Sequence, residues 1–436
     1  MPNCTADSMN FGRLGRRVIE ANFQGGAISS DGGLVLLRQL DQRIGLSKAV
    51  ADVLHDPRDP DRIIHPLRDL IAQRLYGLCC GYEDLNDHDR LRHDPLLQTA
   101  VGKAEVLASS PTFSRLENRA SRADLLALNQ VLVEQFIAAH AKAPAELILD
   151  IDASDVPLHG DQELSEFHGY YDHYCYLPLY VFCGQTMLCC ILRRSRIDGA
   201  KQAAAVIKLL VTRLRQAWPQ THLIVRGDSG FCRQLLIRWC ERHHVSYVIG
   251  VARNARLQKA VADWEAEWEA DYSKTQCKQR MIREFRYAAE SWKTERRLVT
   301  RLEFGSQGRN PRFVVTNLEL PAAMLYDELY CLRGEAENRI KEVQLDLFGT
   351  RASCHTFLAN WLRLLLAALA YTLMQRLRTI ALAGTALAHA QAATIRVKLL
   401  KIGASVIRNS RRIRILLASH HPERETFLIA SRALAP

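Results

Sequence analysis

The stretch Leu147-Ile148-Leu149-Asp150-Ile151-Asp152 decides the fold of this chain. It is a short apolar run that ends in acidic residues, and its length and branched side chains are typical of a buried strand. Two further apolar runs follow at 177–183 and 187–192, and Gly184 between them predicts a hairpin. The chain therefore enters its core through three consecutive strands.

The pattern after this hairpin changes to an alternation of helices and strands. Helical spacing is found at 201–214 and 232–243, and short strand-like runs are found at 222–225 and 246–251. Three strands followed by this alternation predict an α/β fold, namely a mixed sheet with helices on its faces.

Shifts in composition along the chain predict its division into five regions. The first region has helical spacing, the third has strands joined by polar turns, and the last carries seven Lys/Arg and no acids between residues 396 and 414. The expected regions are a helical N-terminal region at 1–145, the first part of the core at 146–254, a β-rich insertion at 255–322, closing core helices at 323–382 and a basic C-terminal region at 383–436.

The overall composition is that of a globular protein with a polyanionic partner. Of the 436 residues, 48% are apolar and 24% are charged, which is enough to bury a sizeable core. The net charge of +11 favours nucleic acid, through neutralisation of phosphates. The twelve cysteines contain no C-x-x-C pair and indicate reduced thiols in a cytoplasmic protein. The uncharged apolar run at 364–375 is too short to span a bilayer, so we expect no membrane association.

Three acidic residues lie where such a core brings them together. Asp152 ends the first strand, and Asp228 follows the strand at 222–225. If these two strands are parallel neighbours, both carboxylates emerge at the carboxyl edge of the sheet. Glu337 lies on a later helix that is able to pack across this edge. Three carboxylates are a plausible minimal cradle for hard divalent cations, and two such ions catalyse phosphodiester chemistry.

Composition and periodicity leave the identity of the first acid open. Asp150 shares the strand face of Asp152 under a period of two, and Asp155 follows three residues later. A strand-end Asp is also commonly a cap or turn residue, so each acid taken alone is weak support for a metal site.

The ordered motifs resemble those of bacterial insertion-sequence transposases of the DDE class, in the group with a Tyr-x2-Arg-x3-Glu-x6-Lys signature. The matching pieces are Ile151-Asp152-Ala153-Ser154, then Arg226-Gly227-Asp228-Ser229-Gly230-Phe231, then Tyr330 to Glu337. The runs 32–37 and 170–180 also resemble one subgroup of these elements. One position departs from the signature, because Gln344 stands where the group has Lys. Lys341, one turn earlier, is a candidate substitute.

The resemblance implies an RNase H-like core interrupted by an insertion, with Asp152, Asp228 and Glu337 as catalytic metal ligands. It implies Mg²⁺ or Mn²⁺ as cofactor, with two ions expected. It also implies cleavage of double-stranded DNA at the element ends and joining of the freed 3′-hydroxyl to target DNA. The helical N-terminal region would bind the DNA ends, and we expect a homodimer on DNA in a bacterial cytoplasm.

The segment around Glu337 is expected to present one functional face. On an α-helix with 100° per residue, Tyr330, Arg333, Glu337, Lys341 and Gln344 fall within an arc of about 80°. Glu335, Glu342 and Asp346 fall on the opposite side. Tyr330, Arg333 and Lys341 are therefore candidate DNA contacts. The alternative is an ordinary surface ladder, since Arg333, Glu337 and Lys341 are spaced four residues apart.

The insertion and the histidine-rich segment supply further candidates. Trp292 with Arg296 and Arg297 would bind DNA, through stacking on an unpaired base and contact with phosphate. The alternative is a Trp packed in the core of a basic strand. His159, His168, Asp172 and His173 match no familiar zinc spacing and are expected in a structural or DNA-facing loop.

Two other functions remain open to the sequence. One is an RNase H-fold nuclease that cuts DNA without joining it, and the other is a DNA-binding protein derived from a transposase without chemistry. The presence of all three acids argues against the second.

Overall fold

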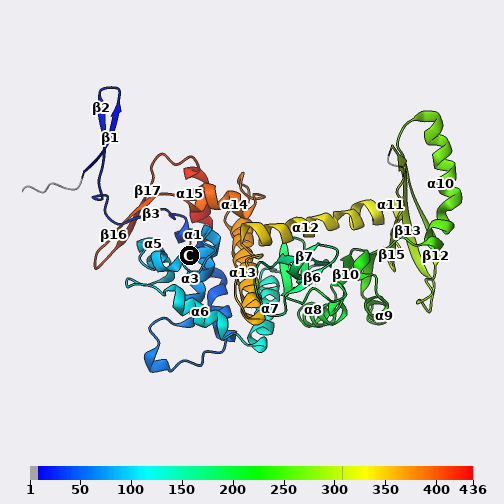
Figure 1. Cartoon of the computed structure of the whole chain (residues 1–436), viewed down its shortest axis with the longest axis horizontal. Helices are drawn as coiled ribbons and strands as arrows, with labels where there is room; N and C mark the ends of the chain where they lie inside the picture. The colour runs from blue at the N-terminus through cyan, green and yellow to red at the C-terminus, as the bar shows by residue number, and fades with distance from the viewer. Residues whose placement is uncertain (1–7, 307, 436) are drawn as a thin grey trace, which may run out of the picture. The chain divides into compact units, whose positions relative to one another are not determined.

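The computed structural model describes residues 8–306 and 308–435, which form two compact units. Of the described residues, one unit contains 8–52, 56–116 and 376–435, and the other contains 53–55, 117–306 and 308–375. Figure 1 labels many of the helices and strands of both. Each unit is described by itself below.

The second unit is built on a nine-stranded sheet of order β12-β13-β15-β11-β10-β4-β8-β9, with β14 paired to β13. Its core comprises β4 (Glu146–Ala153), β8 (Leu179–Cys183), β9 (Thr186–Ile191), β10 (His222–Gly227) and β11 (Ser246–Val251). Strand β4 runs parallel to β10 and antiparallel to β8, and β10 runs parallel to β11. This order and these directions confirm the mixed sheet of an RNase H-like core.

Helices cover both faces of this sheet. Alternate residues of β4, such as Leu149 and Ile151, pack in a large core with α7 (Arg122–Ala138), α8 (Ala203–Ala217) and α9 (Gln234–Arg242). On the other face, Ile224 and Val248 pack against Leu325, Tyr326 and Leu329 of a later helix. The strands read as almost continuous apolar runs because both of their faces are buried.

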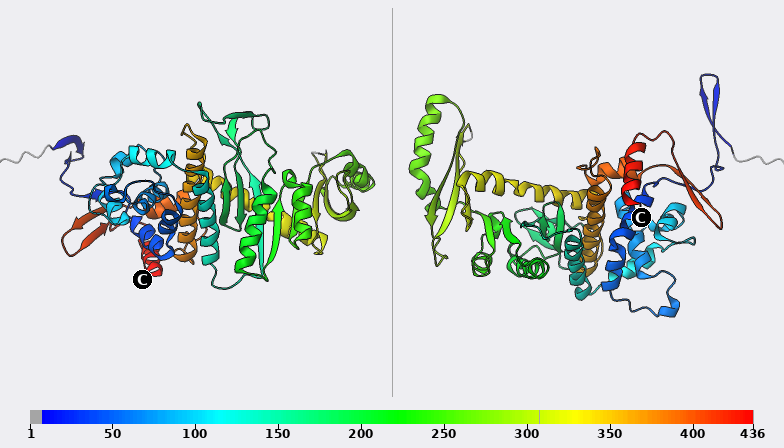
Figure 2. Two further views of the ribbon diagram at one scale, coloured as in Figure 1. Left: turned by 90° about the horizontal axis from the view of Figure 1, so that it is seen from below. Right: turned by 180° about the vertical axis from the view of Figure 1, so that it is seen from behind.

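The insertion continues the central sheet instead of forming a separate layer. Its strands are β12 (Gln279–Tyr287), β13 (Arg296–Gly305), β14 (Gly308–Arg309) and β15 (Arg312–Thr316), and β15 pairs antiparallel with β11. The sequence did not predict α10 (Ala255–Thr275), which lies along β12 and β13 in both views of Figure 2. Only Leu257, Val261 and Glu265 of this helix are buried, so the apolar periodicity of its sequence is weak.

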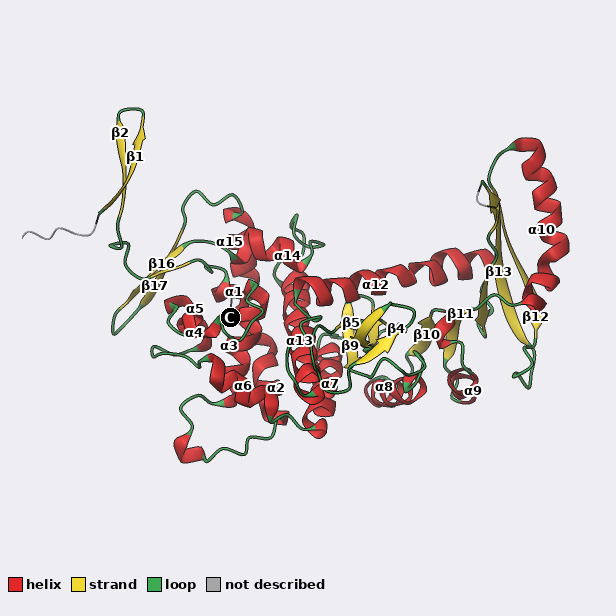
Figure 3. Ribbon diagram, viewed as in Figure 1, coloured by secondary structure: helices red, strands yellow, loops and turns green. Residues whose placement is uncertain are grey.

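The closing helix of the core is irregular. Figure 3 shows an almost unbroken helical run through α12, but its hydrogen bonds change type along the run. It comprises α11 (Ala322–Met324), a π-helical segment Leu325–Tyr330, a 3₁₀ segment Cys331–Arg333, α12 (Gly334–Lys341) and a second π-helical segment Glu342–Asp346. The uniform α-helix expected over 323–345 is therefore wrong in detail. π-Helical turns shift the face of every later residue, and they are common at functional sites.

The other unit is largely helical and also contains short β-sheets. Its N-terminal helices alternate with polar turns as predicted, but β1 and β2 form an exposed hairpin before them. The basic stretch 396–414 begins as a π-helical turn at Arg396–Leu400 and then enters β16 and β17, which pair with each other, and β16 also pairs with β3. The elements are β1 (Met9–Leu14), β2 (Arg17–Ala21), β3 (Ile28–Ser29), α1 (Leu34–Ile44), α2 (Leu46–Val53), α3 (Leu67–Cys80), α4 (His88–Leu91), α5 (Pro95–Val101), α6 (Ser110–Asn118), α14 (Ala392–Ile395), β16 (Ala404–Arg408), β17 (Ile413–Leu417) and α15 (Arg424–Leu434).

One helix of the described residues is long and apolar enough to cross a membrane. Helix α13 (Phe357–Ile380) meets this test by length and composition, but 83% of its most apolar window is buried inside the structure. Trp361 donates a hydrogen bond to the carbonyl of Cys190, and Tyr371 donates to that of Gln185. These contacts are those of a core helix against the β8–β9 hairpin.

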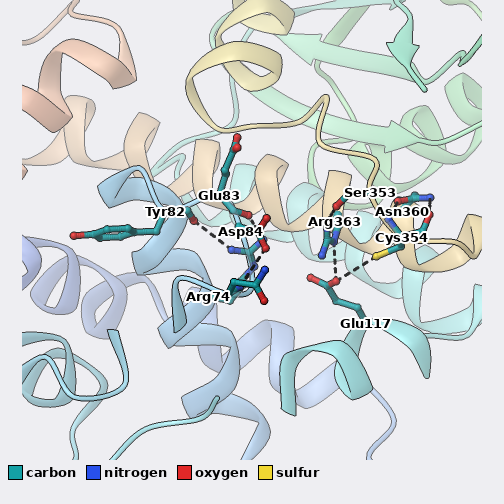
Figure 4. Close-up of polar contacts among 10 residues, drawn as sticks. Arg74, Tyr82, Glu83, Asp84, Glu117, Ser353, Cys354, Asn360 and Arg363 are labelled. Carbon is teal, nitrogen blue, oxygen red and sulfur yellow. Dashed lines mark hydrogen bonds and ion pairs between the residues drawn. The ribbon is translucent and has the colours of Figure 1, made fainter. Parts of the chain in front are cut away.

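Buried polar groups fix the loops within each unit (Figure 4). Arg363 pairs with Glu117 at 2.7 Å, and Asn360 donates to the carbonyl of Cys354. In the other unit, Arg74 donates to the carbonyls of Tyr82 and Glu83. Such contacts satisfy groups that would be costly to bury alone.

Candidate active site

Two of the three predicted acids leave adjacent strands at the same edge of the sheet. Strands β4 and β10 are parallel, and Ile151 is directly opposite Gly227 in their register. Asp152 and Asp228 are the next residues of the two strands, so they lie side by side where the strands end. Asp228 caps a short 3₁₀ turn by accepting a hydrogen bond from the Gly230 amide at 2.9 Å. The parallel pairing on which the sequence argument depended is therefore confirmed.

Arg333 links the third acid to the first. Its guanidinium lies 2.7 Å from the carboxylate of Glu337, one turn later on the same helix. The same guanidinium lies 3.5 Å from the carboxylate of Asp152. Helix α12 thus packs across the edge of the sheet, as expected, and brings Glu337 to the side of Asp152.

The charges of this group are strongly coupled. The pKa of Asp152 is raised to about 7, mainly by burial and to a smaller extent by the negative charges of Asp228 and Glu337, while the amide of Ala153 and the charge of Arg333 oppose this rise. Burial lowers the pKa of Arg333, but the attraction of Asp152, Glu337, Tyr330 and Asp228 raises it above its usual range. The three acids and the arginine therefore share one electrostatic environment.

Asp152 differs in its contacts from Asp150 and Asp155, the two other acids considered for the first position of the site. Asp150 is 3% exposed, and both of its oxygens pair with Arg226, at 2.5 and 2.7 Å. Arg226 also donates to the carbonyl of Leu329, which ties the strand to the closing helix. Asp155 pairs with His173 at 2.8 Å. Asp150 and Asp155 thus have structural partners, and Asp152 is the acid that faces Asp228 and Glu337.

Tyr330 approaches the second acid across a glycine. A Cβ atom on Gly250 would lie 2.6 Å from the Tyr330 hydroxyl and 2.9 Å from the amide nitrogen of Ser229. Only glycine permits this close approach at the end of β11. Gly250 was not predicted as part of the site. Its only signal in the sequence is its position inside the strand-like run 246–251.

Gln344 and Lys341 have different environments. Gln344 is buried, and its amide donates to Ser154 Oγ at 3.2 Å and to the carbonyl of Asp155 at 2.9 Å. It therefore fixes the loop that follows Asp152. Lys341 is exposed. The role of either residue in DNA binding stays a prediction.

The predicted DNA contacts of the insertion are engaged in internal contacts. Arg296 is 5% exposed and pairs with Glu241 through two bonds of 2.6 and 2.9 Å. Its guanidinium lies over the ring of Trp292, 4.9 Å from the ring centre. Arg297 donates to the carbonyls of Leu318 and Leu320 and pairs with Glu284. These contacts favour the packing alternative for Trp292, and the DNA-binding role of the three residues stays a prediction.

The acids fit a divalent cation by the chemistry of their donors. Hard carboxylate oxygens are the ligands that Mg²⁺ and Mn²⁺ prefer, and the negative charges of Asp228 and Glu337 both act on the buried carboxylate of Asp152. Within the described ranges 8–306 and 308–435, no three His, Cys, Asp or Glu side chains are arranged to enclose a metal ion. The guanidinium of Arg333 pairs with both Asp152 and Glu337.

Comparisons with known proteins identify the family of this chain. The family model described as "Transposase DDE domain group 1" matches residues 11–436. Among solved structures, the chain is similar to a piggyBac transposase synaptic complex with hairpin DNA, with 10% sequence identity and a TM-score of 0.42, over 84% of this chain and 79% of that chain. No curated protein matches the sequence. Because the family model spans nearly the whole chain, this protein belongs to the transposase DDE domain family, group 1.

Proposed function

We propose that this protein is a transposase that cuts double-stranded DNA at the terminal inverted repeats of its own element and joins the freed ends to target DNA. One observation carries the proposal. In a chain of the DDE transposase family, Asp152, Asp228 and Glu337 meet around Arg333 at the carboxyl edge of the sheet. This edge is where open α/β sheets place their sites.

Asp152, Asp228 and Glu337 would hold the divalent cations that the family generally uses. We propose Mg²⁺ or Mn²⁺, and two ions. When bound, such ions activate the attacking oxygen and stabilise the leaving oxygen of a phosphodiester. The strand register fixes Asp152 beside Asp228, so the protein sets this part of the site before any ligand arrives.

Arg333 would have a double role in this mechanism. Without cations, it balances the negative charge of Asp152 and Glu337. With the carboxylates bound to cations, its planar guanidinium would be able to donate hydrogen bonds to the oxygens of a DNA phosphate. Tyr330, packed over Gly250 beside Asp228, would line the same position.

Other residues hold the acids in place. The buried Arg226–Asp150 pair joins β4 and β10 to the closing helix, and Gln344 holds the loop after Asp152. Neither contact requires a ligand. Positioning of this kind matters because small displacements of catalytic groups reduce rates strongly.

The proposed partner is DNA, which the protein would bind as a homodimer. The net charge of +11 supports a sequence-independent contribution from phosphate contacts. Exposed cations of the basic C-terminal region, such as Arg411, Arg412 and Arg414, are candidates for this contribution. The N-terminal region would read the inverted repeats.

The test uses duplexes that carry the inverted repeats flanking the gene. The wild-type protein should cut them in Mg²⁺ and join pre-cut ends to a plasmid, whereas Asp228→Asn should bind them and do neither. Cutting without joining would identify a nuclease instead. Binding by the wild type without any metal-dependent cutting would identify a DNA-binding derivative and refute the proposal.

A further inference from the structure

A small sheet beside the carboxylates carries exposed aromatic rings. It consists of β5 (Val156–Pro157), β6 (Glu166–His168) and β7 (His173–Tyr176), labelled in part in Figure 1. Phe167 and Tyr174 are opposite each other in the register of β6 and β7, with ring centres 5.7 Å apart. They are 40% and 56% exposed, and Tyr170 at the turn is 85% exposed. Exposed rings gathered on one hairpin mark a binding surface.

This hairpin is tied to the loop that follows the first acid. His173 of β7 pairs with Asp155 at 2.8 Å. The carbonyl of Asp155 accepts a hydrogen bond from Gln344, on the helical run that carries Glu337. Asp155 is three residues beyond Asp152, so a DNA strand at the carboxylates lies within reach of the hairpin.

A pocket of about 260 Å³ lies next to this hairpin, because Arg194 of its lining pairs with Glu166 of β6. Tyr176 shares a strand face with Tyr174 because side chains alternate along β7. The ring of Tyr176 packs on Phe357 at 5.2 Å, and Phe357 lines the pocket. Among the described residues, the lining of the pocket has four basic side chains and no acidic one, and one of the four, Arg194, is paired with Glu166. These are Arg122, Arg193, Arg194 and Lys201.

One of these cations is buried and incompletely bonded. Arg193 is 3% exposed, and it donates to the carbonyls of Leu177, Gly199 and Lys201 at 2.7 to 3.0 Å. Its Nη2 atom has no hydrogen-bond partner among the described residues. A buried guanidinium donor without a partner is costly, and an anionic oxygen in the pocket would satisfy it.

We propose that the Phe167–Tyr174 face and this basic pocket together bind single-stranded DNA, with bases stacked on the rings and phosphates held by the cations. Rings beside cations are the pattern by which proteins bind unpaired strands without reading their sequence. The inference rests on the proposed function, because DNA processing at the carboxylates is what would present an unpaired strand here.

The aromatic residues of the hairpin and of the insertion differ in how much of their rings is available for stacking. Trp292 packs against Arg296 and Tyr287, with ring centres of Trp292 and Tyr287 5.8 Å apart. Phe167 and Tyr174, by contrast, present ring surface to solvent and lie near the first acid in the chain. A stacking surface is therefore available on the hairpin without any rearrangement of the insertion.

The test measures binding of a fluorescein-labelled oligo(dT) by anisotropy, with EDTA present so that the metal site has no part in the result. Tyr174→Ala should weaken binding by about 5- to 100-fold, since stacking on one ring is lost. Tyr174→Phe keeps the ring and should stay within about twofold of the wild type. Leu209→Ala, an exposed residue of α8 at 70% exposure, is the control for loss of surface area.

The pocket is tested by the salt dependence of the same binding. Lys201→Gln should reduce the slope of log affinity against log salt by about 0.7, which corresponds to one phosphate contact on a single strand. Inorganic phosphate should compete weakly in the wild type if the pocket accepts phosphate oxygens.

Two results would overturn the proposal. The first is oligo(dT) binding by Tyr174→Ala within twofold of the wild type; an altered sedimentation coefficient of this variant would then assign the rings to a second copy of the chain. The second is an equal loss in Tyr174→Ala and Tyr174→Phe. The binding assay contains no metal, so it does not depend on cleavage. A wild-type protein that never cuts DNA would therefore contradict the proposed function and leave the test of single-strand binding unaffected.

Discussion

Arg333 and Asp152 are 181 residues apart in the chain, yet the guanidinium of one lies 3.5 Å from the carboxylate of the other. Arg333 also pairs with Glu337 at 2.7 Å. A positive charge thus stands between two acids proposed as metal ligands, and a cation must compete with it. The arginine keeps the acids together in the absence of metal at the cost of weaker metal binding.

Replacing Arg333 should therefore separate metal binding from catalysis. Arg333→Gln should bind Mn²⁺ about 3- to 10-fold more tightly, because one like charge is removed from the site. It should also cut DNA more slowly, because a donor to phosphate is lost. Calorimetric titration with Mn²⁺ and a cleavage assay measure the two effects. Lys341→Gln, exposed on the same helix, should leave Mn²⁺ affinity unchanged. Weaker Mn²⁺ binding by Arg333→Gln would show that the arginine supports the site.

Asp150 and Asp152 should differ in the kind of damage that their loss causes. Asp150→Asn leaves the buried charge of Arg226 without its partner and should lower the free energy of unfolding by about 3–5 kcal/mol. Asp152→Asn should fold normally and fail to bind Mn²⁺. Denaturant unfolding and Mn²⁺ titration distinguish the two. A stable Asp150→Asn protein that cannot bind Mn²⁺ would reverse the assignment of the first acid.

Trp292 should contribute to stability through its contact with Arg296. Trp292→Ala removes a partly buried ring from the edge of the core and should lower the free energy of unfolding by about 2–4 kcal/mol. Trp292→Phe should recover most of this loss. If Trp292→Ala instead melts like the wild type and loses strand transfer, the original prediction of a DNA-processing role is correct.

His88 should make the helical unit sensitive to acid. Burial lowers the pKa of His88 to about 3, with a further contribution from Arg74. In the unfolded chain its pKa is near 6.5, so the unfolded state takes up a proton that the native state excludes. The contribution of His88 to the free energy of unfolding is therefore fully present above about pH 6.5. It falls as the pH drops towards 3, by up to about 1.4 kcal/mol per pH unit.

The replacement His88→Phe keeps a ring against Phe113 and removes the titration. Its unfolding free energy should depend less steeply on pH between 6.5 and 4 than that of the wild type. His420→Phe, at an exposed site of the same unit, should keep the wild-type slope. Equal slopes for the wild type and His88→Phe would show that other groups control acid unfolding.

The core of the fold was predictable because both faces of its strands are buried. Mostly apolar runs such as 147–152 and 246–251 have few alternative structures, and the structure shows the parallel pairing of β4 and β10 that the sequence argument took as a condition. Helix α10 was missed because only Leu257, Val261 and Glu265 of its residues are buried. A helix with so narrow an apolar face has little periodicity to detect.

The site was predictable in its residues but not in its geometry. Uniform α-helical spacing placed Gln344 with Arg333 and Glu337, but π-helical and 3₁₀ segments interrupt this helix, and Gln344 bonds to Ser154 and Asp155. Hydrogen-bond type along a helix depends on tertiary contacts, which sequence spacing does not contain. The Arg226–Asp150 pair and the contact of Tyr330 with Gly250 also join residues far apart in the sequence, so local spacing does not predict them.

The central claim is that Glu337 is a metal ligand and not a surface partner of Arg333. The direct measurement is Mg²⁺-dependent cleavage of inverted-repeat DNA by Glu337→Gln and by Glu335→Gln, two residues of the same helix that are both charged. Glu335 lies 4.0 Å from Arg339 and is 63% exposed, so its loss should cost tenths of a kcal/mol in stability and leave cleavage near the wild-type rate. We predict that Glu337→Gln folds, binds the DNA and does not cut it. A Glu337→Gln protein that cuts at nearly the wild-type rate would contradict the account.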